Sequence, residues 1–307
     1  MTISAHITSF YGLPIVEFTE ATALDDPRGK AYRLGFDDRD DETDGETLVE
    51  LFHAFLDQPN SQEVTALVFG TGEDYTYSYH LIVDAVTAAA ASLPNLAAVF
   101  FAEVTFDQCE ISWIEQADYD EFLRAFPKLK HLQIRGGSAL QLGTVDHANL
   151  ETLIIEAGGL HASEIRAVTS ATLPALRHLE LWLGTEDYGF NGSIGDLAPL
   201  LLKDCFPKLR YLGLRNSEIA DEIAAEIVAS PLLAHVETLD LSLGTLSDDG
   251  AESLLRSSAV PRLKRLNLEH HYLSPEMMAR FSALGIAVDL GNPQTADDGD
   301  RYVAVGE

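Results

Sequence analysis

A short apolar phrase that recurs along the chain constrains the fold more than any other feature. The phrase runs apolar, two residues, apolar, one residue, apolar, as in Leu129-x-x-Leu132-x-Ile134. The middle residues of its eight copies are Leu67, Val99, Leu132, Leu153, Leu179, Leu212, Leu239 and Leu266. A generic α/β sheet also has apolar strands, but it does not explain one shared spacing. The recurrence therefore predicts a fold built from repeated units.

The segments between the phrases have the apolar spacing of short amphipathic helices. Ser163 and Ser274 are well placed as helix N-caps, and Pro275 suits the first turn of the helix after Ser274. The remaining predicted helices have apolar residues on one side and cover residues 47–56, 84–93, 164–170, 221–230 and 248–257. A short strand followed by a helix leaves an apolar side open, which the next unit covers.

The successive phrases are 21 to 33 residues apart, which is in or just above the range of leucine-rich repeats. They resemble ribonuclease-inhibitor-type repeats, the class with helical outer segments. Glu110–Ile114, Leu212–Ile219 and His270–Leu273 further resemble a prokaryotic family of cytoplasmic leucine-rich-repeat proteins. The resemblance covers most of residues 1–290. It implies an α/β solenoid or horseshoe, with parallel strands on a concave face and helices on a convex face, and it implies no particular activity.

One departure from this repeat type affects the turns. The repeats favour Asn or Cys three residues after the last apolar position, whereas five of the eight copies here have glycine there. We therefore expect tight turns without a regular ladder of polar side chains.

The phrases also divide the chain. Residues 1–60 lack them, and we expect an N-terminal capping region there, because solenoid ends need a polar cover. Residues 61–291 are predicted to form a solenoid of about eight repeats. Residues 292–307 include Asp297-Asp298-Gly299-Asp300 and are predicted to be a flexible acidic tail.

The net charge restricts the choice of partner. The 307 residues contain 49 Asp or Glu and 20 Lys or Arg, for a formal net charge of -29. Such a field repels phosphates and anionic lipids, so we expect neither a nucleic-acid nor a membrane partner, and it would steer a basic partner inward. Solubility alone explains the charge equally well. The start of the chain has no signal-peptide pattern, which predicts a cytoplasmic protein. Cys109 and Cys205 are predicted to be reduced core residues.

We find no motif that predicts a cofactor, a metal or a catalytic residue. Reading Asp40, Asp44 and Gly45 as a calcium loop puts Leu51 where such a loop needs a bidentate glutamate. His270 and His271 would point to opposite faces of a strand, and we expect His271 to hydrogen-bond backbone.

The residues between the repeated apolar positions should point outward from the concave face. Trp182, Tyr211 and Arg215 are of the residue types most enriched at binding hot spots. If the loop of residues 184–195 folds back, however, it covers Trp182. Trp113, in the irregular stretch 106–118, is expected to pack rather than to bind. The predicted partner-binding residues are Trp182, Tyr211, Arg215, Arg135, Glu156, His178, Glu180, Asp240 and Glu269.

These residues lead to three hypotheses. The first is a non-enzymatic scaffold or inhibitor that binds a protein, for which the charge favours a basic one, on its concave face. The second is a structural or accessory subunit of a larger assembly, whose sign would be self-association through an exposed end strand. The third is an enzyme, for which Glu156, Glu180 and His178 are the best available group.

Overall fold

A computed structural model describes residues 3–36, 47–72, 78–202 and 205–307. In these residues, twelve strands form one sheet in the order of the sequence, and all neighbours are parallel except β1 and β2. The strands are β1 (Ser9–Phe10), β2 (Leu13–Glu17), β3 (Ala31–Leu34), β4 (Ala66–Phe69), β5 (Ala98–Phe101), β6 (His131–Arg135), β7 (Thr152–Glu156), β8 (His178–Gly184), β9 (Tyr211–Ser217), β10 (Thr238–Asp240), β11 (Arg265–Asn267) and β12 (Ala287–Asp289).

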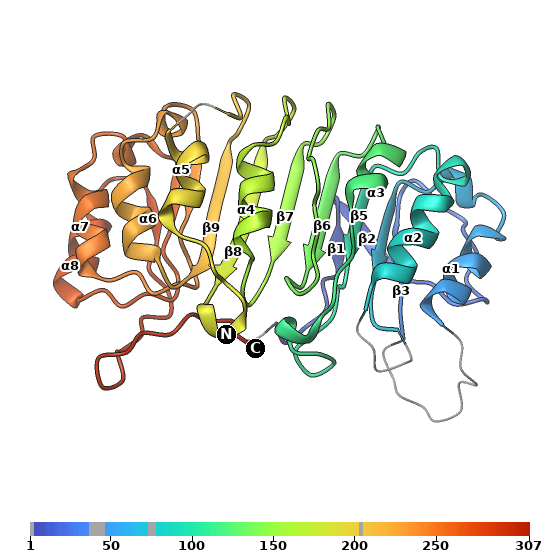
Figure 1. Cartoon of the computed structure of the whole chain (residues 1–307), viewed down its shortest axis with the longest axis horizontal. Helices are drawn as coiled ribbons and strands as arrows, with labels where there is room; N and C mark the ends of the chain where they lie inside the picture. Colours follow the sequence, from blue (N-terminus) through green and yellow to red (C-terminus); the bar gives the residue numbers. More distant parts are fainter. Residues whose placement is uncertain (1–2, 37–46, 73–77, 203–204) are drawn as a thin grey trace.

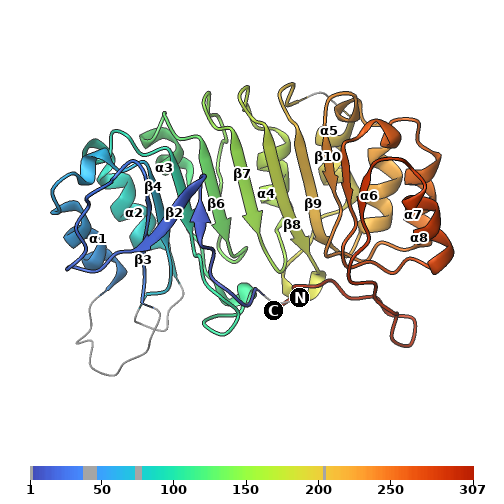
Figure 2. The same ribbon diagram turned by 180° about the vertical axis from the view of Figure 1, so that it is seen from behind.

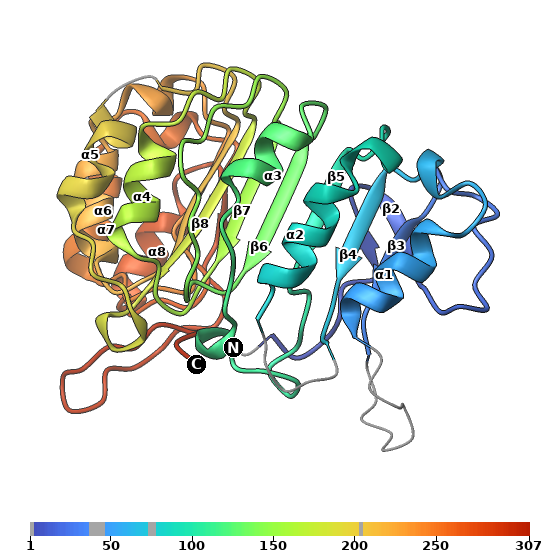
Figure 3. The same cartoon turned by 45° about the vertical axis from the view of Figure 1, so that its right-hand side comes forward.

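The α-helices lie side by side on one face of this sheet (Figure 1, Figure 3). From β3 to β6 and from β7 to β12, each strand is followed by an α-helix and then by the next parallel strand, so the molecule is a repeat-like α/β fold with an open sheet, as predicted. The helices are α1 (Leu48–Leu56), α2 (His80–Ala88), α3 (Asp120–Ala125), α4 (Ala162–Thr169), α5 (Ile194–Leu202), α6 (Ala220–Ile227), α7 (Asp248–Arg256) and α8 (Pro275–Ser282).

The repeated apolar residues form continuous rows beneath the helices. Leu132 pairs with Leu153, which pairs with Leu179, and so on to Leu266, and each of these side chains is almost fully buried. A fully buried leucine contributes about 2 kcal/mol relative to an exposed one. The shared phrase therefore reflects a shared place in one core.

Helix starts follow the predicted caps only in part. Ser274 caps α8 by accepting from the Met277 N–H. The predicted cap Ser163 is wrong, because α4 begins at Ala162 and the Asn191 side chain accepts the Ala162 N–H. The spacing also did not predict α3 or α5.

The N-terminal hairpin covers part of the sheet face that lies opposite the helices, which we call the open face. Figure 2 shows the blue N-terminal strands in front of this face. Phe10 packs there with Ala31, Ala66 and Ala98, which are in register on β3, β4 and β5. Its ring also meets the His131 ring edge-on, at 4.8 Å between centroids. The uncovered part of the open face therefore begins at β6. The predicted capping region supplies strands to the sheet, and its role as a cap stays a prediction.

A buried ion pair fixes this hairpin. Arg33 Nε lies 2.8 Å from Glu103 Oε2, and both side chains are almost completely buried. The other oxygen of Glu103 accepts the Ile7 N–H at 3.1 Å, and His6 Nδ1 lies 2.8 Å from Oε2. Because an unpaired buried carboxylate is costly, Glu103 ties the N-terminal segment to the strand ends.

The C-terminal segment crosses the carboxyl ends of the strands toward the middle of the sheet (Figure 1). Asn216, fully buried, donates to the Val305 carbonyl and accepts the Val305 N–H at 3.0 Å. The Tyr188 hydroxyl donates to Glu307 at 2.7 Å. Residues 292–307 thus have defined contacts here, and the predicted flexibility of this tail in solution stays a prediction.

The predictions for Trp113, for the two cysteines and for the calcium loop have different outcomes. Trp113 does not pack, because 67% of its surface is exposed. Cys109 is buried as predicted, whereas Cys205 is partly exposed. Asp40, Asp44 and Gly45 of the rejected calcium loop lie outside the described residues, and Leu51 is buried in α1. Among the helices that the structure describes, none is long and apolar enough to cross a membrane.

The candidate functional site on the open face

A network of paired side chains occupies the open face between β8 and β10. Arg215 on β9 lies at its centre, with Nη1 2.5 Å from Glu180 and Nε 3.6 Å from Asp240. The Nε–H also donates to Ser242 Oγ at 2.9 Å. The guanidinium lies 5.0 Å from the Trp182 ring centroid, and the indole N–H donates to Glu180 at 2.7 Å. Neighbouring strands are about 4.8 Å apart, so side chains at outward positions reach one another.

Glycine at position 213 provides the space for this arrangement. Gly213 is in register between Glu180 and Asp240. A Cβ atom there would lie 3.1 to 3.4 Å from the side chains of Tyr211, Glu180 and Arg215. Because glycine fills none of this space, Arg215 lies across the gap and contacts both carboxylates.

The electrostatics keep the network charged. Burial alone would raise the pKa of the Glu180 carboxyl, but His178, the charge of Arg215 and the Trp182 N–H lower it to about 2. Burial would likewise lower the pKa of Arg215, and the charges of Glu180 and Asp240 instead raise it. The ion pair therefore stays formed at neutral pH.

An aromatic pair continues the network toward the amino ends of the strands. The His178 and Tyr211 rings stack at 3.9 Å between centroids, with an interplanar angle of 4°. The Tyr211 hydroxyl donates to Asp240 at 2.8 Å, and the Asn267 amide donates to the same oxygen at 2.8 Å. These contacts fix the rotamers of side chains that remain partly exposed on the open face.

A second, smaller group lies on β6 and β7. Arg135 Nε donates to Glu156 at 2.6 Å, and Gln133 donates to the other oxygen of Glu156 at 2.8 Å. The Arg135 guanidinium also donates to the Val104 carbonyl and lies 5.2 Å from the Phe100 ring centroid. Of the three residues of the enzyme hypothesis, His178 and Glu180 lie together, with Nε2 3.4 Å from Oε2, whereas Glu156 pairs with Arg135. The hypothesis itself stays a prediction.

The predicted partner-binding residues lie on one face of the sheet, as expected, but most of them are less exposed than predicted. Trp182 is 6% exposed, so the exposed-anchor interpretation is wrong. Arg135, Glu156, Glu180 and Asp240 are also buried, because paired neighbours cover them. The members of the predicted set that stay partly exposed are His178, Tyr211, Arg215 and Glu269. Their role in binding a partner stays a prediction.

Sequence reasoning missed two features of this face. Gly213 gave no signal, because its role depends on side chains from neighbouring strands. The hairpin that covers β3 to β5 had a detectable signal, since the outward residues Ala66, Val68, Ala98 and Phe100 are all apolar. Apolar outward positions indicate a covered face.

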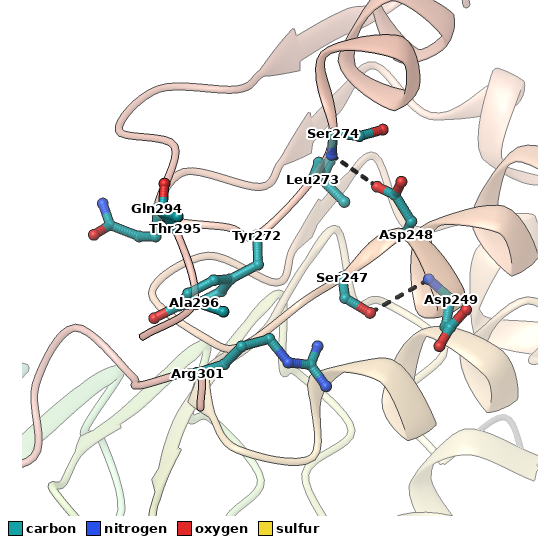
Figure 4. A pocket seen from close by; sticks show the side chains of 10 residues that line it. All are labelled: Ser247, Asp248, Asp249, Tyr272, Leu273, Ser274, Gln294, Thr295, Ala296 and Arg301. Carbon is teal, nitrogen blue, oxygen red and sulfur yellow. Dashed lines mark hydrogen bonds between the residues drawn. The ribbon is translucent and has the colours of Figure 1, made fainter. Parts of the chain in front are cut away.

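The remaining candidates are structural. His271 accepts the Leu273 N–H through Nδ1, and its Nε2 lies 3.2 Å from the Leu290 carbonyl, so it bonds backbone as expected. A pocket of about 410 Å³ lies between the start of α7 and the C-terminal segment (Figure 4). Its cap groups are already paired: Ser247 accepts the Asp249 N–H, and Asp248 accepts the Ser274 N–H.

Comparison with known proteins identifies a relative among the solved structures. No family model and no curated protein matches the chain. The structure is similar to the crystal structure of a Bacteroides fragilis protein from the Northeast Structural Genomics Consortium, with a TM-score of 0.79 and 30% sequence identity. The match covers 86% of this chain and 74% of that chain. With that identity over most of both chains, the protein belongs to the same family as this Bacteroides fragilis protein.

Proposed function

We propose that this protein is a non-enzymatic scaffold or inhibitor that binds another protein on the open face between β6 and β11. We further propose that its repeats are leucine-rich repeats of the ribonuclease-inhibitor type in a horseshoe. The recurring phrase and the parallel strand–helix order support that assignment. The observation that carries the functional proposal is the ordered network around Arg215.

Side chains that are already held in one rotamer before binding favour a higher affinity for the partner. A free arginine or tyrosine loses rotamer freedom when a partner immobilises it, at about 0.5 to 1.5 kcal/mol for each side chain. Here Glu180 and Ser242 already hold Arg215, and Asp240 and His178 hold Tyr211. Both side chains keep part of their surface exposed, so a partner would meet preformed groups of the types enriched at hot spots.

The charge has two separate roles in this proposal. On the open face, Arg215 lies beside Glu180 and Asp240 and Arg135 pairs with Glu156, so contacts there would be polar and aromatic as well as ionic. The net charge of -29 comes mainly from the rest of the molecule. It would accelerate the approach of a basic partner from a distance, and added salt would reduce that acceleration.

Ile154 provides a test that leaves the network intact. It lies half-exposed on β7, beside Glu180 in register. We expect Ile154→Arg to block the open face without removing a paired group. Leu81→Arg is the matched control, because Leu81 is 60% exposed on α2.

The measurement is capture from native lysate, followed by titration with the purified partner at low and moderate salt. Binding that is retained by wild type and Leu81→Arg but lost in Ile154→Arg supports the proposal. Equal binding by both variants would exclude the open face as the site where the partner binds. Binding that does not weaken with salt would remove the basic-partner part alone.

A further inference from the structure

The end of the sheet at β12 differs from the interior repeats in how well its core is covered. In β10 and β11, the core residues Leu239 and Leu266 are fully buried. Their counterpart in β12 is Val288, which is only partly buried. Other apolar residues packed on the core at this end are also partly exposed, namely Met278, Leu284, Ile286 and Leu290. The last repeat therefore leaves apolar surface that a further element would cover.

The backbone of β12 also has an open edge. Among the described residues, β11 is the one strand that pairs with β12. The Ala287 N–H donates to the Lys264 carbonyl, and the Asp289 carbonyl accepts the Leu268 N–H. The backbone groups of Ala287 and Asp289 therefore point toward β11. Alternation in a parallel ladder directs the N–H and carbonyl of Val288 outward. A short edge strand without proline or lysine is open to pairing with another chain.

The local charge at this end departs from that of the whole chain. Residues 256–291 contain five Arg or Lys and three Asp or Glu, and Glu237 and Glu252 pair with three of these cations. Together these groups are neutral, whereas the protein has a net charge of -29. Two copies that approach through other surfaces bring acidic surfaces together. Contact at this end avoids that local repulsion.

We propose that the β12 end is a self-association surface, through which two copies pair their β12 strands antiparallel about a two-fold axis. With Val288 opposite the partner's Val288, the two residues exchange both outward hydrogen bonds, which is the hydrogen-bonded pair of an antiparallel ladder. The same register places Ile286 opposite the partner's Leu290, so the exposed apolar residues cover each other. A two-fold contact is closed and uses the same patch on both copies.

This register makes a specific prediction about charge. Ala287 and Asp289 are two residues apart and point to the open face, so Ala287 of each copy lies opposite the partner's Asp289. Ala287 is exposed, and changes there should leave the fold intact. Opposite charges directly across two strands stabilise the pair and like charges destabilise it.

Sedimentation velocity over a concentration series tests the proposal, with wild type, Ala287→Asp and Ala287→Lys compared at low and high salt. We expect a weak dimer that becomes tighter with salt, because salt screens the repulsion between the two acidic bodies. Ala287→Asp should weaken the dimer roughly tenfold and Ala287→Lys should strengthen it, since each change acts twice across the axis. Val288→Pro, which removes an outward N–H, should abolish it.

Two results would overturn the proposal. One is a monomeric wild type at every concentration and salt level, and the other is a dimer that all three variants leave unchanged. A dimer that becomes tighter in Ala287→Asp would contradict the proposed register, in which position 287 lies opposite the partner's Asp289. The Ile154→Arg variant should dimerise normally, so the outcome is independent of the partner proposed for the open face.

Discussion

The guanidinium of Arg215 lies 2.5 Å from the Glu180 carboxylate, and the two residues come from neighbouring strands, β9 and β8. Both are at outward positions, where polar side chains usually meet solvent. Here each is largely covered by its partners, with the Arg215 side chain 18% exposed and the Glu180 side chain 9% exposed. The face that we propose for binding is therefore already a packed layer.

Removing Arg215 should destabilise the fold. Arg215→Ala leaves Glu180 and Asp240 without their shared cation, so we expect a loss of about 3 kcal/mol in the free energy of unfolding, measured by urea denaturation. The same change in a Glu180→Gln background should cost less, because one of the two buried charges is gone. Equal losses in both backgrounds would show that the pair is not coupled.

Gly213 offers a second test of the same layer. A Cβ at Gly213 would contact Tyr211, Glu180 and Arg215 closely, so Gly213→Ala should lower the unfolding free energy by about 1 to 2 kcal/mol. Gly195→Ala in α5 is the control, since the nearest contact of its Cβ would be 3.4 Å and alanine favours helix. A neutral Gly213→Ala would mean that the side chains can move apart.

The repeat, its strands and most helices could be predicted from sequence because each depends on local spacing. Leu132 and Leu179 show this, since the same phrase places both in one core row. The sequence leaves both an exposed and a covered Trp182 open. Local spacing cannot choose between them, because Arg215, which lies over the Trp182 ring, comes from the next strand and its reach depends on the glycine at 213. Alternation gives the direction of a side chain, whereas exposure depends on its neighbours.

Element boundaries failed for a similar reason. Ser163 is a good cap by residue type, yet the side chain of Asn191, nearly thirty positions later, caps α4 instead. The last residues of the chain read as a polar tail, and the partner of Val305 is a buried asparagine on β9. Contacts between distant segments leave no periodic signal.

Lowering the pH should destabilise the protein in two separate windows. Burial lowers the pKa of His131 to about 4 from an ordinary value of 6.5, so the unfolded chain takes up the proton first. Above pH 6.5, His131 is neutral in both states and does not change the free energy of unfolding. As the pH falls from 6.5 to 4, it lowers the free energy of unfolding by up to roughly 3 kcal/mol. The pKa of Glu180 is lowered to about 2, so its contribution is present above about pH 4.5 and is lost below that value.

Urea denaturation across this range checks both windows. His131→Gln should flatten the slope of the unfolding free energy between pH 6.5 and 4 relative to wild type. An unchanged slope in His131→Gln would show that His131 takes up its proton equally in both states.

Asn216 should control the order of the C-terminal segment. It is fully buried with a φ of 50°, and its amide pairs with both backbone groups of Val305. Asn216→Ala loses these bonds and keeps the strained backbone, and we expect a loss of about 3 kcal/mol. Asn216→Gly should lose about 1 kcal/mol less, because glycine accepts a positive φ. Hydrogen exchange at Ala304 and Val305 should become fast in both variants, and retained protection would show that other contacts hold the segment.

The two tryptophans give a direct test of the corrected exposures. Trp113 is 67% exposed and Trp182 is 6% exposed, and the chain contains no other tryptophan. In Trp113→Phe, the remaining Trp182 should emit at short wavelength and resist quenching by acrylamide, whereas in Trp182→Phe the remaining Trp113 should emit at long wavelength and be quenched readily. Trp182→Ala should lower the unfolding free energy by about 3 kcal/mol, and Trp113→Ala by less than about 0.5 kcal/mol. Similar quenching of both residues would mean that Arg215 does not cover Trp182 in solution, and the exposed anchor that the sequence favoured would return as the binding hypothesis.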